Sequence, residues 1–270
     1  MKSETYRAFF GFETEPFPTD IDLRDILLTD DLKGVWNRFQ FAVNIGAVAL
    51  ITGEVGSGKS TALKYAIGQL HPSEYRAFQI TATSGSILEL YKQILSELGV
   101  NMSGSSRAVL TSRIKQEFYE WVHNKRMKAV LIIDEASLLH LDIFKELHTL
   151  LHFRHDMGST LPLILAGQSN LIDHLSYRSS SPLASRIVGR CHLEGSNLHD
   201  METYIEHHLS IAGIKTKLFD ESAIIAIHQG SGGLYRKANN IARGALVAAA
   251  IEKSMSVNAE HVRLASTELF

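Results

Sequence analysis

The sequence contains few residues that cross-link a chain or stiffen its backbone, and it has no long apolar segment. Among its 270 residues are five prolines and a single cysteine, Cys191. A lone cysteine cannot form a disulfide within the chain, which makes a reducing cytoplasm the expected compartment. The N-terminus lacks the apolar core of a signal peptide, and no uncharged apolar run approaches the roughly 18 residues of a membrane helix. We therefore expect a cytoplasmic protein that has no membrane partner.

The chain also lacks an excess of charge of either sign. Its 27 basic and 29 acidic side chains leave a formal net charge of -2. This balance argues against strong attraction of the whole molecule to nucleic acid, although a local basic stripe is compatible with it. What is present is an ordinary globular composition, 45% hydrophobic and 21% charged, in a chain long enough for an α/β core and a smaller second domain.

Short apolar runs alternate with amphipathic stretches in the middle of the chain. The expected strands are 47–52, 77–81, 129–133 and 161–166, with a weaker fifth at 190–193. Helical spacing of apolar residues marks the segments between them, among them 86–98, 108–123 and 141–153. Continuously apolar strands separated by helices predict a parallel sheet that is covered on both faces.

The two ends of the chain differ from this middle part. Residues 1–30 contain four phenylalanines and two X-Pro steps, which favour extended backbone, so we expect a strap laid over the core, followed by a helix at 31–43. After about residue 197 the strand signals stop. Three or four helices are expected there, at 199–212, 220–229, 233–252 and 258–269.

Local signals set the ends of these helices and the borders of the predicted domains. Asp220 is expected to cap a helix N-terminus, and Gly213 and Gly230 to end helices. The predicted domains are a strap and helix at 1–45, an α/β nucleotide-binding core at 46–196 and a helical lid at 197–270.

The segment GEVGSGKS fits the phosphate-binding loop pattern G-x-x-x-x-G-K-[ST], between an expected strand and an expected helix. Its glycines let backbone N–H groups face phosphates, and the helix N-terminus adds positive potential. Lys59 is expected to reach the β- and γ-phosphates of ATP, and the Ser60 hydroxyl to bind Mg²⁺. A glycine-rich turn with a solvated lysine is the weaker alternative. The expected nucleotide-binding residues of the loop are Gly53, Glu54, Val55, Gly56, Ser57, Gly58, Lys59, Ser60 and Thr61.

A second motif, AVLIIDEA, ends an apolar strand on two carboxylates. Asp134 is expected to hold the Mg²⁺ ion, and Glu135 to accept a proton from the attacking water. Alone, the pattern could be a strand end followed by a helix cap. The phosphate-binding loop earlier in the chain favours the catalytic interpretation.

Together these motifs resemble those of AAA+ ATPases. The similarity is most specific to ATPase domains of the ExeA (general secretion pathway A) type and to transposition helpers of the TniB, TnsC and MuB kind. It runs through nearly the whole chain, in the segments YRAFFGFETEPF, GEVGSGKST, LIIDEA, LILAGQSNL, SPLASRI and GSGGLYRKANNIARGAL. The resemblance implies an AAA+ P-loop fold with a parallel five-stranded sheet and a helical lid, hydrolysis of ATP with Mg²⁺, and a ring or helical oligomer.

The resemblance also implies roles for three further residues. Gln168 falls where the family keeps a polar sensor that positions the water, and Asn170 is the alternative in a shifted alignment. Arg186 falls at the position of an arginine finger that completes the site of a neighbouring subunit, with Arg178 and Arg190 as the next candidates. Arg236 falls at the sensor position of the lid. For both Arg186 and Arg236 a solvated surface arginine is the alternative.

Two weaker signals involve basic residues. The segment 107–128 carries a charge of +4, from six basic residues against Glu117 and Glu120, and is either a solvated helix and loop or a DNA-binding face. Its candidate DNA-binding residues are Arg107, Arg113, Lys115, Lys125, Arg126 and Lys128. The second signal is a histidine stripe on one helical face, which lacks an evident further metal ligand and favours a solvated or subunit-facing surface. Its members are His148, His152 and His155.

The leading functional prediction from the resemblance is a DNA-transposition regulator. It would assemble on duplex DNA with ATP, and its partners would be itself, a transposase and a target-selection protein. The alternative is an ExeA-type ATPase that assists assembly of a secretion apparatus. Such proteins continue into a membrane segment and a peptidoglycan-binding region, which we do not expect in a sequence that ends at Phe270. A nucleotide-gated binding module without hydrolysis is disfavoured by Glu135.

Overall fold

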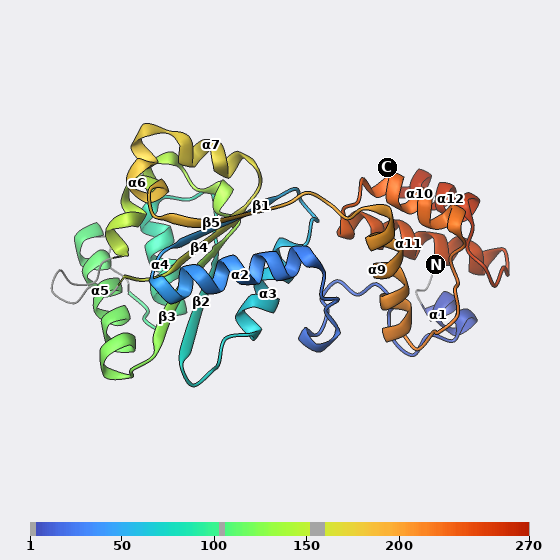
Figure 1. Cartoon of the computed structure of the whole chain (residues 1–270), viewed down its shortest axis with the longest axis horizontal. Helices are drawn as coiled ribbons and strands as arrows, with labels where there is room; N and C mark the ends of the chain where they lie inside the picture. Colours follow the sequence, from blue (N-terminus) through green and yellow to red (C-terminus); the bar gives the residue numbers. More distant parts are fainter. Residues whose placement is uncertain (1–3, 103–105, 152–159, 270) are drawn as a thin grey trace. The chain divides into compact units, whose positions relative to one another are not determined.

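The computed structural model describes residues 4–102, 106–151 and 160–269, which fall into two compact units (Figure 1). The α/β unit comprises Asp30–Gly53 and Ala62–Leu193. The helical unit comprises Met1–Thr29, Glu54–Thr61 and Glu194–Phe270. Each unit has a hydrophobic core of its own.

The α/β unit is built on a parallel five-stranded sheet, as predicted. Its spatial order is β2-β3-β4-β1-β5. The strands are β1 (Val48–Gly53), β2 (Tyr75–Thr81), β3 (Lys128–Asp134), β4 (Leu163–Gly167) and β5 (Ile187–Leu193). Because every pairing is parallel, the carboxyl ends of all five strands lie at one edge of the sheet.

Burial differs between the central strands and the edge strands of the sheet. Almost every residue of the three central strands, β1, β3 and β4, is buried, as expected for strands covered on both faces. The edge strands β2 and β5 alternate between buried and exposed residues. β5 also contains Gly189 and Arg190, which interrupt its apolar pattern, so only its last residues were recognisable.

Helices cover both faces of this sheet. One face packs against α2 (Asp30–Ile45), whose buried residues include Val35 and Phe39. The other face shares a core with five helices, namely α4 (Ile87–Glu97), α5 (Arg107–Tyr119), α6 (Leu141–Leu150), α7 (Asn170–Ser176) and α8 (Ser181–Ala184). The remaining helix of the P-loop crossover is α3 (Lys59–Gly68). α4 begins with a capping box, in which Ser86 and Glu89 exchange side chain–backbone hydrogen bonds.

The predicted helix at 108–123 does not stay α-helical to its end. α5 ends at Tyr119 and continues as one π turn, Glu120–Asn124. The Lys125 N–H donates to the Glu120 carbonyl oxygen over 3.0 Å, which is the i to i+5 bond of that turn. Arg126 follows with a left-handed φ of 54° and returns the chain to β3.

Four helices form most of the helical unit. They are α9 (Leu198–Ile211), α10 (Glu221–Ser231), α11 (Tyr235–Ile251) and α12 (Ala259–Leu269). Asp220 caps α10 by accepting the Ala223 N–H, as predicted, and Gly213 follows α9 with a φ of 93°. The prediction that Gly230 ends a helix is wrong. Gly230 lies inside α10, and the left-handed cap is Gly232 with a φ of 61°.

The phenylalanine-rich start of the chain belongs to the helical unit, not to the core of the sheet. It begins with a helix, α1 (Glu4–Phe10), where the sequence suggested an extended strap. Phe10, Phe12 and Phe17 are buried in the core formed by α9 to α12. Arg243 of α11 pairs with Glu15 and donates to the Phe17 carbonyl oxygen. A helix and buried aromatic contacts therefore replace the expected strap over the α/β core.

No helix in the described part of the chain is long and apolar enough to cross a membrane.

Candidate nucleotide site

The phosphate-binding loop lies between β1 and α3 and depends on two glycines with left-handed backbone. Gly56 has a φ of 87° and Gly58 a φ of 99°, which a residue with a side chain adopts only with strain. A Cβ atom on Gly56 would also lie 2.9 Å from the Cβ of Arg236. A Cβ on Gly58 would lie 3.5 Å from the Tyr235 ring. Gly56 is therefore required both by its backbone conformation and by a close neighbour.

The polar side chains of the loop are buried. Lys59 is 6% exposed, and its ammonium donates to the Glu54 carbonyl oxygen over 2.8 Å. Ser57 is 4% exposed, and its hydroxyl oxygen lies in the interior without a hydrogen-bond partner. A buried hydroxyl without a partner is costly unless a ligand satisfies it. The loop therefore fits a polar ligand such as the phosphates of a nucleotide.

The first turn of α11 contacts this loop. The Arg236 N–H donates to the Gly56 carbonyl oxygen over 3.3 Å, joining two predicted nucleotide-binding residues that are far apart in the sequence. The Arg236 side chain is exposed and has no ion pair within the described residues. Tyr235, which sequence reasoning missed, packs on Tyr204 with ring centroids 4.6 Å apart, and Tyr204 donates to Asn239. The loop thus rests on a fixed helix end that offers a free guanidinium.

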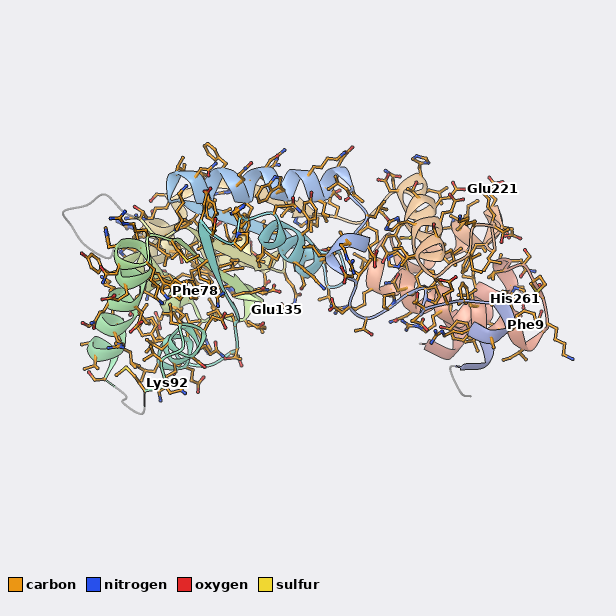
Figure 2. The ribbon with its side chains drawn as sticks, turned by 90° about the horizontal axis from the view of Figure 1, so that it is seen from below. Phe9, Phe78, Lys92, Glu135, Glu221 and His261 are labelled. Atoms are coloured by element: carbon orange, nitrogen blue, oxygen red, sulfur yellow. The ribbon has the colours of Figure 1, made fainter. Side chains whose placement is uncertain are left out.

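Asp134 and Glu135 stand at the carboxyl end of β3 (Figure 2). Asp134 is 7% exposed, and its Oδ1 accepts the Glu135 N–H over 2.9 Å. Glu135 has a φ of 52°, in the left-handed region that residues other than glycine rarely occupy. Such strained positions cluster at functional sites, because the surrounding structure must hold them in place. The two adjacent carboxylates therefore differ in exposure, since Asp134 is buried and Glu135 is half-buried.

Gln168 comes to the same edge of the sheet from the next strand. It follows β4, and its N–H donates to the hydroxyl oxygen of Ser137 over 3.2 Å. Ser137 is buried in a short 3-10 helix, Ala136–Leu138, directly after Glu135. A Cβ on Gly167 would lie only 2.8 Å from the Ser137 nitrogen, so the two segments pack tightly. Asn170, the alternative sensor, is exposed at the start of α7. Ser137 carries no motif signal and was not predicted.

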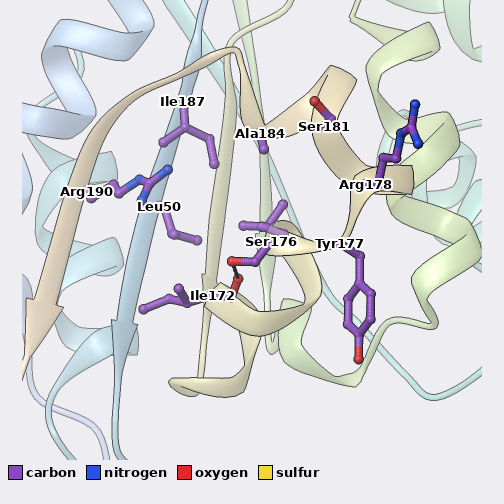
Figure 3. A pocket seen from close by; sticks show the side chains of 10 residues that line it. Leu50, Ile172, Ser176, Tyr177, Arg178, Ser181, Ala184, Ile187 and Arg190 are labelled. Atoms are coloured by element: carbon purple, nitrogen blue, oxygen red, sulfur yellow. Dashed lines mark hydrogen bonds between the residues drawn. The ribbon is translucent and has the colours of Figure 1, made fainter.

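The three candidate finger arginines lie on the segment that runs from a short 3-10 helix, Arg178–Ser180, through α8 into β5. Arg178 and Arg190 line a cavity of about 340 Å³ (Figure 3), and Arg186 directly precedes Ile187 in the sequence, which also lines that cavity. Arg190 lies beside Leu50 at the sheet edge, and Arg178 points away from both. Within the described residues none of the three has an ion pair or a side-chain hydrogen bond. This side of the α/β unit therefore presents uncompensated positive charge.

The six predicted DNA-binding residues differ in the side chains that surround them. Arg107 pairs with Glu146, and Arg113 pairs with Glu117 over 2.5 Å. The Lys125 and Lys128 ammonium groups lie instead against aromatic rings. Arg126 is exposed in the turn after the π segment, and Lys115 is half-buried on α5.

The predicted Mg²⁺ ligands are oxygen donors and not histidines or cysteines. Within the described residues no group of three or more His, Cys, Asp and Glu side chains is arranged to hold a metal ion. The two predicted Mg²⁺ ligands belong to different units, Ser60 to the helical unit and Asp134 to the α/β unit, and each is an oxygen donor of a type that Mg²⁺ takes together with phosphate oxygens. Of the histidine stripe, His148 has a buried Nδ1 without a partner, while His152 and His155 lie outside the described residues.

The sequence is similar to a known domain family and to proteins of known function. Residues 46–175 match the family model described as an AAA domain. The chain is 26% identical over 265 residues to general secretion pathway protein A of Aeromonas hydrophila, covering 98% of this chain and 48% of that protein. It is 23% identical over 169 residues to the ATP-dependent target DNA activator B of Escherichia phage Mu, covering 60% and 48%. The chain spans about half the length of these curated relatives.

Solved structures share the fold at low sequence identity. Cdc6p from Pyrobaculum aerophilum matches with a TM-score of 0.69 and 16% identity, over 98% of this chain and 71% of that chain. The Aeropyrum pernix ORC1 protein, solved in complex with DNA, matches with a TM-score of 0.67 and 16% identity, over 96% and 70%. At these identities the likeness supports the fold alone.

Proposed function

We propose, from the premise that this chain belongs to the AAA+ ATPases, that it is an ATP-dependent DNA-transposition regulator. It would oligomerise on duplex DNA and recruit or activate a transposase. The observation that carries the proposal is its similarity over 169 residues to target DNA activators that depend on ATP. A match to both activators from phages Mu and D108 supports it further.

The reaction is the hydrolysis of ATP to ADP and phosphate. In our assignment, the loop N–H groups and Lys59 bind the phosphates, Glu135 accepts a proton from the attacking water, and Gln168 orients that water. Bound Mg²⁺, held by Ser60 and Asp134, would neutralise charge on the phosphate oxygens.

Two arginines complete the assignment. Arg236 would face the nucleotide of its own subunit from the predicted lid, residues 197–270. Its backbone contact with Gly56 supports that role. Arg186 would act on the nucleotide of a neighbouring subunit, so hydrolysis would require an oligomer. The uncompensated charge around Arg186 supports an interaction with an anionic partner.

DNA contacts are assigned to the basic segment 107–128. A chain with a net charge of -2 cannot bind DNA through its overall field, so contacts must be concentrated on one surface and repeated by oligomerisation. The affinity for duplex DNA is then expected to rise with ATP, to fall steeply with salt and to depend little on sequence.

The second candidate function is assembly of a secretion apparatus. The observation that favours it is the match to general secretion pathway protein A, which is higher in identity and covers 98% of this chain.

Fluorescence anisotropy of a labelled duplex, with a non-hydrolysable ATP analogue and a salt series, distinguishes the two functions. The transposition proposal requires duplex binding at low salt that strengthens with the analogue. If no duplex binding is detected at low salt, with nucleotide binding intact, the secretion function is favoured instead.

A further inference from the structure

Four of the six basic residues of segment 107–128 fall into two electrostatic classes. Arg107 and Arg113 are next to carboxylates, Glu146 and Glu117, which cancel most of their field. Lys125 and Lys128 are held by aromatic rings. An aromatic ring fixes the position of a cation but leaves its net charge in place. Of these four residues, only Lys125 and Lys128 present charge that a polyanion can use.

The aromatic contacts join two segments that are separate in the sequence. The Lys125 ammonium lies 3.4 Å from the centroid of the Trp121 ring, and the Arg76 guanidinium lies 5.7 Å from the same ring. The Lys128 ammonium lies 4.9 Å from the centroid of Tyr75 and donates to its hydroxyl over 3.2 Å. Arg76 lies outside the basic segment and was not predicted from the sequence.

Strand pairing produces this arrangement. Tyr75 and Lys128 are partners at the first position of β2 and β3, and Arg76 follows Tyr75. Arg126 is exposed in the intervening turn and has no side-chain hydrogen bond or ion pair among the described residues. We call Arg76, Lys125, Arg126 and Lys128 the aromatic-edge cluster. Its four cations lie at the amino ends of two neighbouring strands.

The backbone beneath the cluster is unusual twice within seven residues. The π turn at Glu120–Asn124 carries Trp121, and Arg126 has a φ of 54°. π turns are rare and occur frequently at functional sites, and left-handed residues other than glycine persist only where the structure holds them. A plain solvated helix end would need neither feature.

We propose that the aromatic-edge cluster binds the phosphate backbone of duplex DNA, an assignment that rests on the proposed function and narrows its DNA-binding surface. Duplex is favoured over single-stranded DNA because single strands bind by stacking bases on exposed aromatic rings. Trp121 is half-buried, packs edge-on against Phe78 with centroids 5.4 Å apart, and carries the Lys125 ammonium over its face. The ring therefore positions cations and does not offer a stacking platform.

The test compares two double variants that remove the same charge from one segment. Lys125→Gln/Lys128→Gln removes aromatic-held cations, and Arg107→Gln/Arg113→Gln removes carboxylate-paired ones. At near-physiological salt, the first pair is expected to lower duplex affinity about 10-fold or more and to flatten the slope of log affinity against log salt by about 2. The second pair is expected to lower the affinity about twofold at most. Thermal unfolding and ATP binding of each variant check that the fold is kept.

A third variant tests the role of the ring. Trp121→Leu keeps every charge but removes the surface that holds Lys125 and Arg76. It is expected to weaken duplex binding severalfold with the salt slope unchanged, because the number of phosphate contacts stays the same. Arg76→Gln is expected to act like the loss of one cluster lysine.

The outcomes separate this proposal from the function on which it rests. Failure of the wild-type chain to bind duplex at low salt overturns the proposed function. Wild-type binding with equal losses in the two double variants, or a larger loss in Arg107→Gln/Arg113→Gln, overturns the aromatic-edge cluster and leaves the function standing. Tighter binding of a single strand than of a duplex of equal length also contradicts the cluster as proposed.

Discussion

The two units of the molecule hold their polar residues in different ways. Among the described residues of the α/β unit, three of the four that are polar and buried, Thr52, Asp134 and Ser137, lie at or just beyond the carboxyl ends of strands, while Ser180 lies in a short 3-10 helix. In the helical unit some buried polar contacts join distant parts of the chain, as when the His208 ring binds the Pro16 carbonyl oxygen over 2.8 Å. Sheet geometry places the first group, whereas tertiary packing places the second.

This difference suggests that the two units have different roles, one in the reaction and one in stability. Residues at the end of a parallel strand are positioned by a ladder of backbone hydrogen bonds and can carry strained or reactive side chains. The long-range contacts of the helical unit hold the chain's N-terminal segment against α9 and α11. We therefore expect substitutions in the α/β unit to change the reaction, and substitutions in the helical unit to change stability, with the phosphate-binding loop and Arg236 as the exceptions.

The largest expected effects come from one residue of the phosphate-binding loop, Lys59, and one residue of the α/β unit, Glu135. Lys59, which is grouped with the helical unit, should be needed for nucleotide binding, so Lys59→Ala should abolish it. Glu135, in the α/β unit, should be needed only for hydrolysis, so Glu135→Gln should keep nucleotide binding and lower turnover by at least about 100-fold. Equilibrium binding of a fluorescent ATP analogue and phosphate release measure the two effects. Wild-type turnover in Glu135→Gln would refute the base assignment.

The next effect concerns Arg186 of the α/β unit. Arg186→Ala should lower turnover by about 10³-fold, because an arginine finger stabilises charge in the transition state. If Arg186 acts across a subunit boundary, mixing Arg186→Ala with Lys59→Ala protein should restore part of the activity. A mixed interface can then pair an intact loop with an intact finger. Mixed oligomers that form without any rescue would move the finger to Arg178 or Arg190.

A smaller effect should be confined to the helical unit and depends on pH. Burial, and then the neighbouring His207, lower the pKa of His208 to about 4 from 6.5, although the bond to Pro16 acts in the opposite direction. The pKa of His208 is lower in the folded than in the unfolded protein. Its contribution to the free energy of unfolding is therefore fully present above pH 6.5 and is lost as pH falls from 6.5 towards 4. The loss is up to about 3 kcal/mol.

Tryptophan fluorescence separates the two units in this titration. Both tryptophans, Trp36 and Trp121, lie in the α/β unit, so acid should reduce helical circular dichroism before it changes the fluorescence. His208→Gln is the control, since its amide can still donate to Pro16 but does not titrate near pH 5. A wild-type curve that matches the control between pH 6.5 and 4 would contradict the role of His208.

The smallest effects come from matched helix caps, one in each unit. Ser86 caps α4 and Asp220 caps α10, each through a side chain that accepts a backbone N–H at the third helical position. Replacing either by Ala should cost about 1 kcal/mol and lower the melting temperature by roughly 2–4 °C. Calorimetry shows whether the units melt independently. If the units melt independently, each variant should shift only the transition of its own unit. If either variant shifts the transitions of both units, the units unfold together.

Sequence patterns predicted the fold well where the signal is local. Continuous apolar runs identified the central strands, and the loop glycines with Lys59 identified the P-loop class, which the comparisons confirm. Asp220 was recognisable because a cap and its acceptor lie within one turn. Gly230 misled the prediction, because a glycine can sit inside a helix while the next glycine, at position 232, ends it.

The rest depends on contacts between distant residues, which one sequence does not encode locally. Arg76 joins Trp121 only because β2 and β3 pair in one register, and a search limited to a continuous basic segment could not find it. Likewise, Ser137 matters only because β4 brings the Gln168 N–H to it. Attachment of the first residues to α11 rests on Arg243 and Glu15, 228 positions apart.

The N-terminal segment has a consequence for how the protein is made. Phe10, Phe12 and Phe17 leave the ribosome long before the helices that bury them, which begin at Leu198. At ordinary rates of synthesis these side chains wait roughly 10–40 s for their partners. During that time the α/β unit can fold while an aromatic segment stays exposed at its N-terminal side. Nascent chains of this protein should therefore bind chaperones through this aromatic segment until α9 and α11 have emerged.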